Sequence, residues 1–353
     1  MVSNTRGEVD DGRLPLCALL SHALVAFTIE FDNEFEHQMP HRTTNHGSNT
    51  AARDAPWLVS MVMWLKFMRF VPDEGVPLSE LSRVLGMDAK SRKLWLTRLG
   101  KWWGYVEVNA GVVRPTAGGR RARAIWGSLT TMIEKRWEER FGQEHIGRLK
   151  EILREIVSRL PRELPDSLPI LGYGLFSRSS ADERGAPISE LTLPLLLSKV
   201  LLAFALEFES DSEVSLAIAA NLLRLGERVS IKDLPKLAAV SKEAVAMSLS
   251  FLEKRGYAAI EPQSPMSRVK VLTLTPKGKH ARNEYLRLVW AIEERWEADY
   301  GRNNIVALRE LLTPLAGHLA PPYPDGWRAS LPQPEGLPHY PMILHRGGFP
   351  DGS

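Results

Sequence analysis

The chain has 353 residues, a length that suggests two domains at roughly 150 residues per domain. Hydrophobic residues make up 44% and charged residues 25%, and 45 Lys and Arg against 42 Asp and Glu leave a net charge of +3; this composition excludes disordered, collagen-like and fibrous classes. The single cysteine, Cys17, excludes an internal disulfide and a cysteine-rich zinc site, and it fits a reducing, cytoplasmic location.

The first half of the chain begins with an apolar stretch, residues 14–31, followed by a polar insert at 39–55. Residues 1–13 are acidic where a secretory signal would be basic, so we expect a disordered N-terminus and no export. Hydrophobic periodicity and turn residues then predict two short helices, a hairpin and a long helix. These elements are predicted at 78–85, at 89–102 with Asp88 as cap, at 105–108, at 112–114 and from Ala117 onward.

The second half repeats this order after its own apolar stretch, residues 191–208. Val245, Leu249 and Leu252 have helical spacing, and Pro276 suits the first turn of a helix. The elements are predicted at 193–209, 213–225, 231–239 (capped by Ser230), 241–254 (capped by Ser241), 257–260, 269–274, 276–300 and 303–319.

The two apolar stretches could be mistaken for membrane spans. Each carries a polar residue near its middle, His22 or Lys199, and ends near a Glu. A spanning helix needs about 20 predominantly apolar residues. Both stretches are therefore predicted to be buried core helices, and we expect no membrane association.

Four segments recur in the same order, which indicates an internal duplication. The offset between copies falls from 177 to about 153 and ends at 159, as expected from the 39–55 insert in the first copy and a longer hairpin in the second. Three of the pairs are Ala26-Phe-Thr-Ile-Glu-Phe31 with Ala203-Phe-Ala-Leu-Glu-Phe208, Trp103-Gly-Tyr105 with Arg255-Gly-Tyr257, and Glu134-Lys-Arg-Trp137 with Glu293-Glu-Arg-Trp296. The fourth pairs residues 76–87 with 229–240.

The duplication predicts one repeat at 14–160 and a second at 191–320. Residues 161–190 are rich in Pro, Gly and Ser and read as a linker. Residues 321–353 hold eight prolines and five glycines, so a disordered or loosely packed tail is expected. Two short helices followed by a two-stranded hairpin make a winged helix-turn-helix. The predicted fold is mainly α, with two tandem winged helix-turn-helix repeats, small β-hairpin wings and long flanking helices.

The second repeat resembles the MarR family of bacterial transcription regulators over nearly its whole length. The resemblance is carried by Leu252-Glu-Lys-Arg-Gly-Tyr257, Ser267-Arg-Val-Lys-Val271 and Leu274-Thr-Pro-Lys-Gly278. The first repeat departs from this pattern: its helix end, Leu99-Gly-Lys-Trp-Trp-Gly104, is one residue longer, and its wing is shortened to Asn109-Ala-Gly111.

The resemblance implies double-stranded DNA as the partner. Family members dimerise through their first and last helices, so the fused repeats imply an intramolecular pseudo-dimer that acts as a monomer, with further self-association left open. The family also implies a small aromatic or lipophilic effector. Seven of the ten tryptophans lie in the first repeat, and Trp57, Trp64 and Trp95 are the candidate pocket residues, although this spacing is also typical of core.

Local charge supports DNA binding better than the global charge. Residues 77–126 hold ten Lys or Arg against three acids, and residues 229–287 hold eleven against five. Basic surfaces of this kind bind phosphates through counterion release. The outward residues near the start of a recognition helix reach base edges, and wing residues contact the minor groove or phosphates. The candidate DNA contacts are Lys90, Arg92, Lys93, Thr97 and Arg114 in the first repeat, and Lys242, Glu243, Ser250, Arg268 and Lys270 in the second.

Other site classes find little support. His37, His41 and His46 lie in or beside the polar insert without a carboxylate cluster, so a loop is expected rather than a metal site. The glycine-containing segments match neither the GxGxxG nor the P-loop pattern, and no Gly-x-Ser-x-Gly occurs. We therefore expect no enzymatic activity, no cofactor and no metal.

The sequence thus predicts a sequence-specific DNA-binding transcription regulator. The alternative is a winged-helix module for protein–protein interaction that has lost DNA readout. Small neutral residues on the second recognition helix favour this alternative, namely Ala244, Ala246, Ser248 and Ser250.

Overall fold

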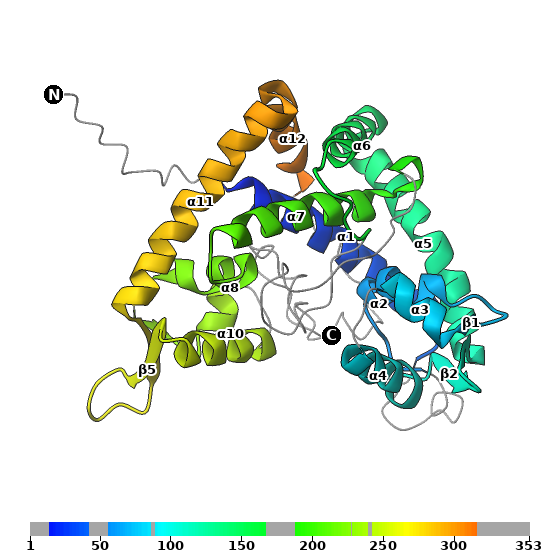
Figure 1. Cartoon of the computed structure of the whole chain (residues 1–353), viewed down its shortest axis with the longest axis horizontal. Helices are drawn as coiled ribbons and strands as arrows, with labels where there is room; N and C mark the ends of the chain where they lie inside the picture. Colours follow the sequence, from blue (N-terminus) through cyan, green and yellow to red (C-terminus); the bar gives the residue numbers. More distant parts are fainter. Residues whose placement is uncertain are drawn as a thin grey trace.

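The computed structural model describes residues 14–41, 56–85, 89–166, 188–226, 228–238 and 242–315. These residues are mainly helical and form two small antiparallel sheets, an architecture consistent with the winged-helix class. Figure 1 shows the long helices α1 (Leu16–Gln38) and α7 (Leu193–Ser210) crossing the centre, with a small lobe below each flank. The predicted N-terminal segment 1–13 and the tail 321–353 lie outside the described residues.

The same order of elements occurs in the first and the second half. In the first half, α1 is followed by α2 (Met61–Lys66), η2 (Met68–Phe70), β1 (Val76–Pro77), α3 (Leu78–Leu85), α4 (Ala89–Thr97), the π-helical η3 (Arg98–Trp102), β2 (Val106–Asn109), β3 (Val112–Pro115), α5 (Ala117–Phe141) and α6 (Gln143–Ser158). In the second half, η5 (Ile188–Glu190) and α7 are followed by α8 (Leu216–Asn221), η6 (Leu223–Leu225), β4 (Val229–Ser230), α9 (Leu234–Ala238), α10 (Lys242–Lys254), β5 (Ala258–Pro262), β6 (Lys270–Leu274), α11 (Pro276–Tyr300) and α12 (Arg302–Leu312).

Each sheet has three strands, where the sequence predicted a two-stranded hairpin. The strand orders are β1-β3-β2 and β4-β6-β5, so a two-residue edge strand joins each hairpin. Ser230 belongs to β4 and pairs with Val271, and the helix that it was expected to cap begins only at Leu234. A two-residue strand has too few residues for a visible alternation, and its partner lies about 40 residues away, which explains why the sequence pattern missed it.

The predicted helix 213–225 is shorter and divided. It begins at Leu216, where Ser215 is the N-cap and its hydroxyl accepts a hydrogen bond from the Ile218 N–H at 3.3 Å. After Asn221 the chain tightens into the 3-10 turn η6. The last predicted helix, 303–319, ends at Leu312 as α12, and its residues beyond 315 lie outside the described part.

The predicted recognition helix of the first half contains an extra residue, which lies in a π-helical segment. The Tyr105 N–H donates to the Leu99 carbonyl, six residues back, at 2.7 Å, whereas the Tyr257 N–H donates to the Leu252 carbonyl, five residues back, at 2.8 Å. The segment η3 supplies the additional residue while both leucines stay buried. A one-residue insertion in a helix is commonly accommodated in this way.

Both predicted core helices are buried. α1 contacts α7, α5 and α12, and α7 contacts α6, α11 and α1. By length and composition, α1 is the one helix of the described residues that could cross a membrane, but 94% of its most apolar window is buried within the protein. The prediction that residues 14–31 and 191–208 form core helices is confirmed.

Two buried carboxylates join the halves. Glu134 on α5 accepts a hydrogen bond from the Leu193 N–H at the start of α7 at 2.7 Å and pairs with Lys150. Glu293 on α11 accepts one from the Leu16 N–H at the start of α1 at 2.5 Å and pairs with Arg309. Each of α5 and α11 therefore supplies the carboxylate that caps the first long helix of the other half.

The beginning of the predicted linker 161–190 is held against the fold. Asp166 is buried and forms ion pairs with Lys199 on α7 at 3.1 Å and with Arg69 in η2 at 3.4 Å. Residues 167–187 lie outside the described part, as do residues 42–55 of the polar insert.

Candidate nucleic-acid interface

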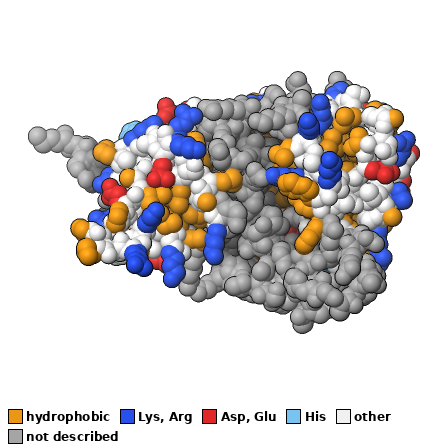
Figure 2. Space-filling view, turned by 90° about the horizontal axis from the view of Figure 1, so that it is seen from below, with side chains coloured by type: hydrophobic (Ala, Val, Ile, Leu, Met, Phe, Trp, Pro, Cys, Tyr) orange, Lys and Arg blue, Asp and Glu red, His pale blue; other side chains and the backbone are white. Residues whose placement is uncertain are grey.

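The two predicted recognition helices, α4 and α10, lie on the same side of the molecule, one in each lobe (Figure 1). Figure 2 shows this side, where Lys and Arg side chains are spread over both lobes and acidic side chains are fewer. A surface of this sign matches the charge of a phosphate backbone.

On α4 the buried and exposed sides are set by aromatic packing. Trp95 is buried, and its ring lies 6.0 Å from the rings of both Phe67 and Trp103. Lys93 is consequently exposed, and Leu94 beside it is 42% exposed. Both residues therefore lie on the solvent-exposed side of α4.

The other predicted contacts on α4 are less open. Arg92 is half-buried, and the Thr97 hydroxyl, also half-buried, donates to the Lys93 carbonyl at 2.8 Å. The side chain of Lys90 lies outside the described part, although its backbone belongs to α4. Lys93 is therefore the clearest candidate for a base contact among the predicted residues of this helix.

An aromatic–arginine cluster that was not predicted from the sequence lies at the end of this helix. The Arg98 guanidinium lies 5.0 Å from the Trp95 ring centroid and 5.5 Å from that of Trp102, which is 55% exposed. Stacking of this kind holds a guanidinium in place. The spacing Trp95, Arg98, Trp102 was a signal that could have revealed it, because residues three and four apart share a helix face.

The wing of the first half is a tight hairpin. Ala110 and Gly111 both have positive φ, 50° and 76°, as a two-residue turn between β2 and β3 requires. Arg114 on β3 is exposed, but it lies opposite Glu107 on β2, which reduces its attraction for phosphate.

Some basic residues of the first half form contacts within the protein and are therefore not available to a partner. Arg120 donates to the Pro115 carbonyl at 2.9 Å, and Arg123 forms an ion pair with Asp73 at 2.5 Å. The count of ten basic residues therefore overstates the charge that is available to a partner.

In the second half, Ala246 of α10 is exposed, whereas Ser248 is buried. Val245, Leu249 and Leu252 are buried, as their spacing predicted. Lys242 is exposed at the first residue of the helix, and Ser250 is half-buried. The Glu243 side chain lies outside the described part.

The loop of the second wing is longer than that of the first, and both of its predicted basic contacts are accessible. Arg268 and Lys270 are both exposed. The loop is ordered by hydrogen bonds from the Gln263 N–H to the Val269 carbonyl at 2.8 Å and from Arg228 to the Gln263 carbonyl at 3.0 Å. Met266 at the tip is 95% exposed.

Equivalent junctions fix each wing to the following long helix. Thr116 donates to the Gly104 carbonyl and accepts from the Gly119 N–H, at 2.7 and 3.0 Å. Thr275 makes the same pair of bonds with Gly256 and Gly278, at 2.7 and 3.1 Å. These threonines are the N-caps of α5 and α11, so wing and long helix keep a fixed relative position.

The three predicted pocket tryptophans belong to different surroundings. Trp57 is 43% exposed, Trp64 stacks on Trp126 with 6.0 Å between ring centroids, and Trp95 lies in the cluster beneath α4. A cavity of about 580 Å³ exists elsewhere, between the end of α6, α7 and α11, and these tryptophans do not line it.

The remaining groups considered in the sequence are the single cysteine and the histidines in or beside the polar insert. Cys17 is fully buried, and burial raises the pKa of its thiol well above the ordinary value, so the group stays protonated. Among the described residues, which include His37 and His41 but not His46, no cluster of three His, Cys, Asp or Glu could hold a metal ion.

No family model and no curated protein matches the chain. Among solved structures, the chain is similar to the crystal structure of apo (heme-free) PefR, with 24% identity over 34% of this chain and 89% of that chain. The TM-score is 0.25, which is too low for an argument about fold or function. The candidate interface is therefore assigned from the residues of this chain alone.

Proposed function

We propose that this protein is a double-stranded DNA-binding transcription regulator of the winged-helix class, a binding protein rather than an enzyme. The observation that carries the proposal is that α4, α10 and the second wing lie on one side of the molecule (Figure 1) and that each has an exposed basic residue, namely Lys93, Lys242 and Arg268. Recognition helices and wings contact the major groove and the backbone from one side in this class.

The proposal includes two DNA-reading halves in one chain. The reciprocal caps support it: Glu134 holds the start of α7, and Glu293 holds the start of α1. The helix contacts support it as well, since α1 packs on α12 and α7 packs on α6. Such an exchange of first helices between halves is what a fused pseudo-dimer requires.

The halves differ in the chemistry that they offer to DNA. In the first half a helix with Lys93 and Leu94 is paired with a short wing, and in the second half a small-residue helix is paired with a long basic wing. We infer that the first half reads bases more strongly and that the second half relies on wing and phosphate contacts. The operator is accordingly asymmetric.

Selection from a pool of random duplexes of about 30 base pairs, followed by a salt titration, tests this function. The affinity is expected to fall steeply between about 50 and 200 mM salt, and one asymmetric motif should be enriched. Binding without enrichment would contradict sequence-specific regulation, and absence of binding at low salt would contradict DNA binding altogether.

A protein–protein interaction module is the second candidate. Exposed apolar side chains favour it: Leu94 and Trp102 at the first helix, and Leu237, 50% exposed, on α9. If DNA does not bind, these residues define the surface on which a protein partner is sought.

A further inference from the structure

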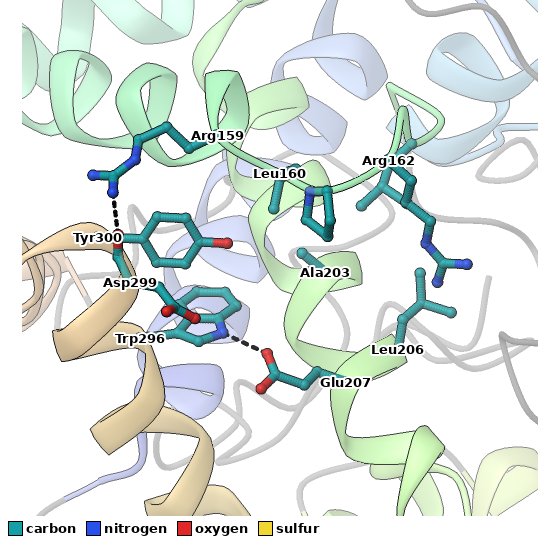
Figure 3. Close-up of a pocket in the computed structure, with 11 residues that line it drawn as sticks. Arg159, Leu160, Arg162, Ala203, Leu206, Glu207, Trp296, Asp299 and Tyr300 are labelled. Atoms are coloured by element: carbon teal, nitrogen blue, oxygen red, sulfur yellow. Dashed lines mark hydrogen bonds between the residues drawn. The ribbon is translucent and has the colours of Figure 1, made fainter.

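The segment that follows α6 is held against the protein by one acidic residue. Asp166 is buried and pairs with Lys199 on α7 at 3.1 Å and with Arg69 in η2 at 3.4 Å. Figure 3 shows Leu160 of this segment beside α7, whose Leu206 lines the same cavity. The carboxylate of Asp166 thus ties the central helix α7 to the short helices of the first half.

The sequence of this segment recurs after α12. Leu160-Pro-Arg-Glu-Leu-Pro-Asp166 aligns with Leu319-Ala-Pro-Pro-Tyr-Pro-Asp325 when the offset of 159 between the two copies is continued. The alignment needs no gap, because Asp166 lies ten positions after Ile156 and Asp325 lies ten positions after Leu315. Ile156 and Leu315 are both fully buried, and Leu315 is the last residue that the structure describes. The duplication therefore continues beyond the described part of the chain.

The arginine that pairs with Asp166 has a counterpart in the second half. Arg69 and Arg224 each lie in the 3-10 turn after a short helix, in η2 and η6. The Arg69 Nε donates to the carbonyl four residues back at 2.6 Å, and the Arg224 Nε donates to the carbonyl four residues back at 3.2 Å. The two side chains are therefore held in the same way by their own helices.

The lysine that pairs with Asp166 corresponds to a histidine. The offset of 177 between the two core helices relates Lys199 on α7 to His22 on α1, and both side chains are buried. A histidine can donate a hydrogen bond to a carboxylate. A basic residue is therefore present at both positions that contact Asp166 in the first half.

The start of α1 lies near Arg224. Burial raises the pKa of Tyr285 on α11 well above the ordinary value, and the charges of Cys17 on α1 and of Arg224 act on it in opposite directions. Burial also lowers the pKa of the Arg224 guanidinium to about 10. A carboxylate beside Arg224 would favour its charged form.

The apolar surface that receives the segment is repeated as well. At each surface a tryptophan packs edge-to-face on two aromatic rings. The two sets are Trp296 with Phe204 and Tyr300, at 5.3 Å between centroids in each case, and Trp137 with Phe27 and Phe141, at 5.2 and 5.7 Å. Ile29 on α1 corresponds to Leu206 on α7. The second copy of the segment therefore has an apolar surface of the same kind to cover.

We propose that residues 319–325 dock on α1 as residues 160–166 dock on α7, with the Asp325 carboxylate between His22 and Arg224 and with Tyr323 in the place of Leu164. The inference goes beyond the proposed DNA binding and does not depend on it. In each half, the segment after the last helix would then tie a central helix to the short helices that precede the sheet.

Trypsin cleavage of the full chain tests the proposal without any substitution. Arg328 lies three residues after the docked segment, whereas Arg346 lies far beyond it. A docked segment must open before trypsin can bind the chain around Arg328. We expect initial cleavage at Arg328 to be at least about tenfold slower than at Arg346, with each rate divided by that of a synthetic peptide of residues 317–353. Equal normalised rates would overturn the proposal.

A double-mutant cycle tests the position of the carboxylate. Asp325→Asn should raise the unfolding equilibrium constant of the full chain in urea by at least about tenfold, because a hydrogen bond to a charged group is lost. In an Arg224→Gln background the same change should have almost no effect, since residues in contact are coupled. Glu335→Gln, which neutralises an acid further along the tail, is the matched control and should change this constant by less than about twofold.

No loss of stability in Asp325→Asn, or an equal loss with and without Arg224→Gln, would overturn the proposal. The trypsin measurement on the unaltered chain covers the case in which Arg224→Gln does not fold. None of these measurements involves DNA, so this proposal and the proposed function fail separately.

Discussion

Glu293 accepts a hydrogen bond at 2.5 Å from the backbone N–H of Leu16, which lies 277 residues earlier in the chain. The N-cap residue of α1, Pro15, offers no side-chain hydrogen bond, so this carboxylate takes the place of a local cap. Its other oxygen accepts from Arg309 at 2.6 Å, and Arg309 also donates to the Leu14 carbonyl at 2.5 Å. The last two helices of the described chain, α11 and α12, thereby bind the start of its first helix, α1.

This closure predicts a large effect of neutralising Glu293, which is 5% exposed. Glu293→Gln leaves the buried Arg309 without its counter-charge and should lower the free energy of unfolding by about 3 kcal/mol, as measured by urea denaturation. Glu139→Gln on α5 breaks an exposed pair with Lys135 and serves as the control, with a loss below about 0.5 kcal/mol. Equal losses in the two variants would show that the cap contributes little.

The π-helical segment η3 predicts an unusual tolerance to deletion. Removing the exposed Lys101 shortens the distance from Leu99 to Tyr105 to the five residues found between Leu252 and Tyr257. We expect a folded protein whose unfolding free energy changes by about 1 kcal/mol or less, because the π segment can revert to α. Deletion of Lys135 within the regular helix α5 is the control and should unfold the protein, since every later side chain of that helix is rotated by about 100°. A similar loss in both would argue against this role of η3.

Two glycines hold the wings against the long helices. A Cβ at Gly278 would lie 1.9 Å from the Tyr257 carbonyl oxygen, and one at Gly119 would lie 2.0 Å from that of Tyr105. Either Gly→Ala change should therefore destabilise the protein by about 3 kcal/mol, because a backbone atom must move. Gly127→Ala on α5 meets nothing within 4 Å and should instead stabilise by about 1 kcal/mol. Thermal unfolding of the three variants distinguishes these outcomes.

The proposed DNA interface predicts different effects for helix and wing. Lys93→Ala should lower affinity for the selected operator by about 1–3 kcal/mol and relax sequence preference at its base. Arg268→Ala should weaken binding to all sequences and lower the slope of log K against log salt by about 1. Lys135→Ala, an exposed lysine of α5, is the control and should leave affinity unchanged. Equal behaviour of all three in fluorescence anisotropy would place the DNA elsewhere.

The sequence by itself determined the helices with strong local signals. The boundaries of α3 and α11 agree with the predicted 78–85 and 276–300, because apolar spacing, an N-terminal cap or proline, and a following glycine act within a few residues. The same holds for the core roles of α1 and α7, whose composition alone requires burial.

Only the tertiary structure decided how distant groups meet. The edge strands β1 and β4, the caps of α1 and α7 by Glu293 and Glu134, and the cavity beside Trp296 each depend on partners far apart in the sequence. The tertiary structure also decided which predicted DNA contacts are accessible. Lys93 is exposed, whereas the Thr97 hydroxyl donates a hydrogen bond to a carbonyl of its own helix. A local pattern specifies which residues are helical or apolar, but the partner of a buried charge or a two-residue strand is set by packing of the whole chain.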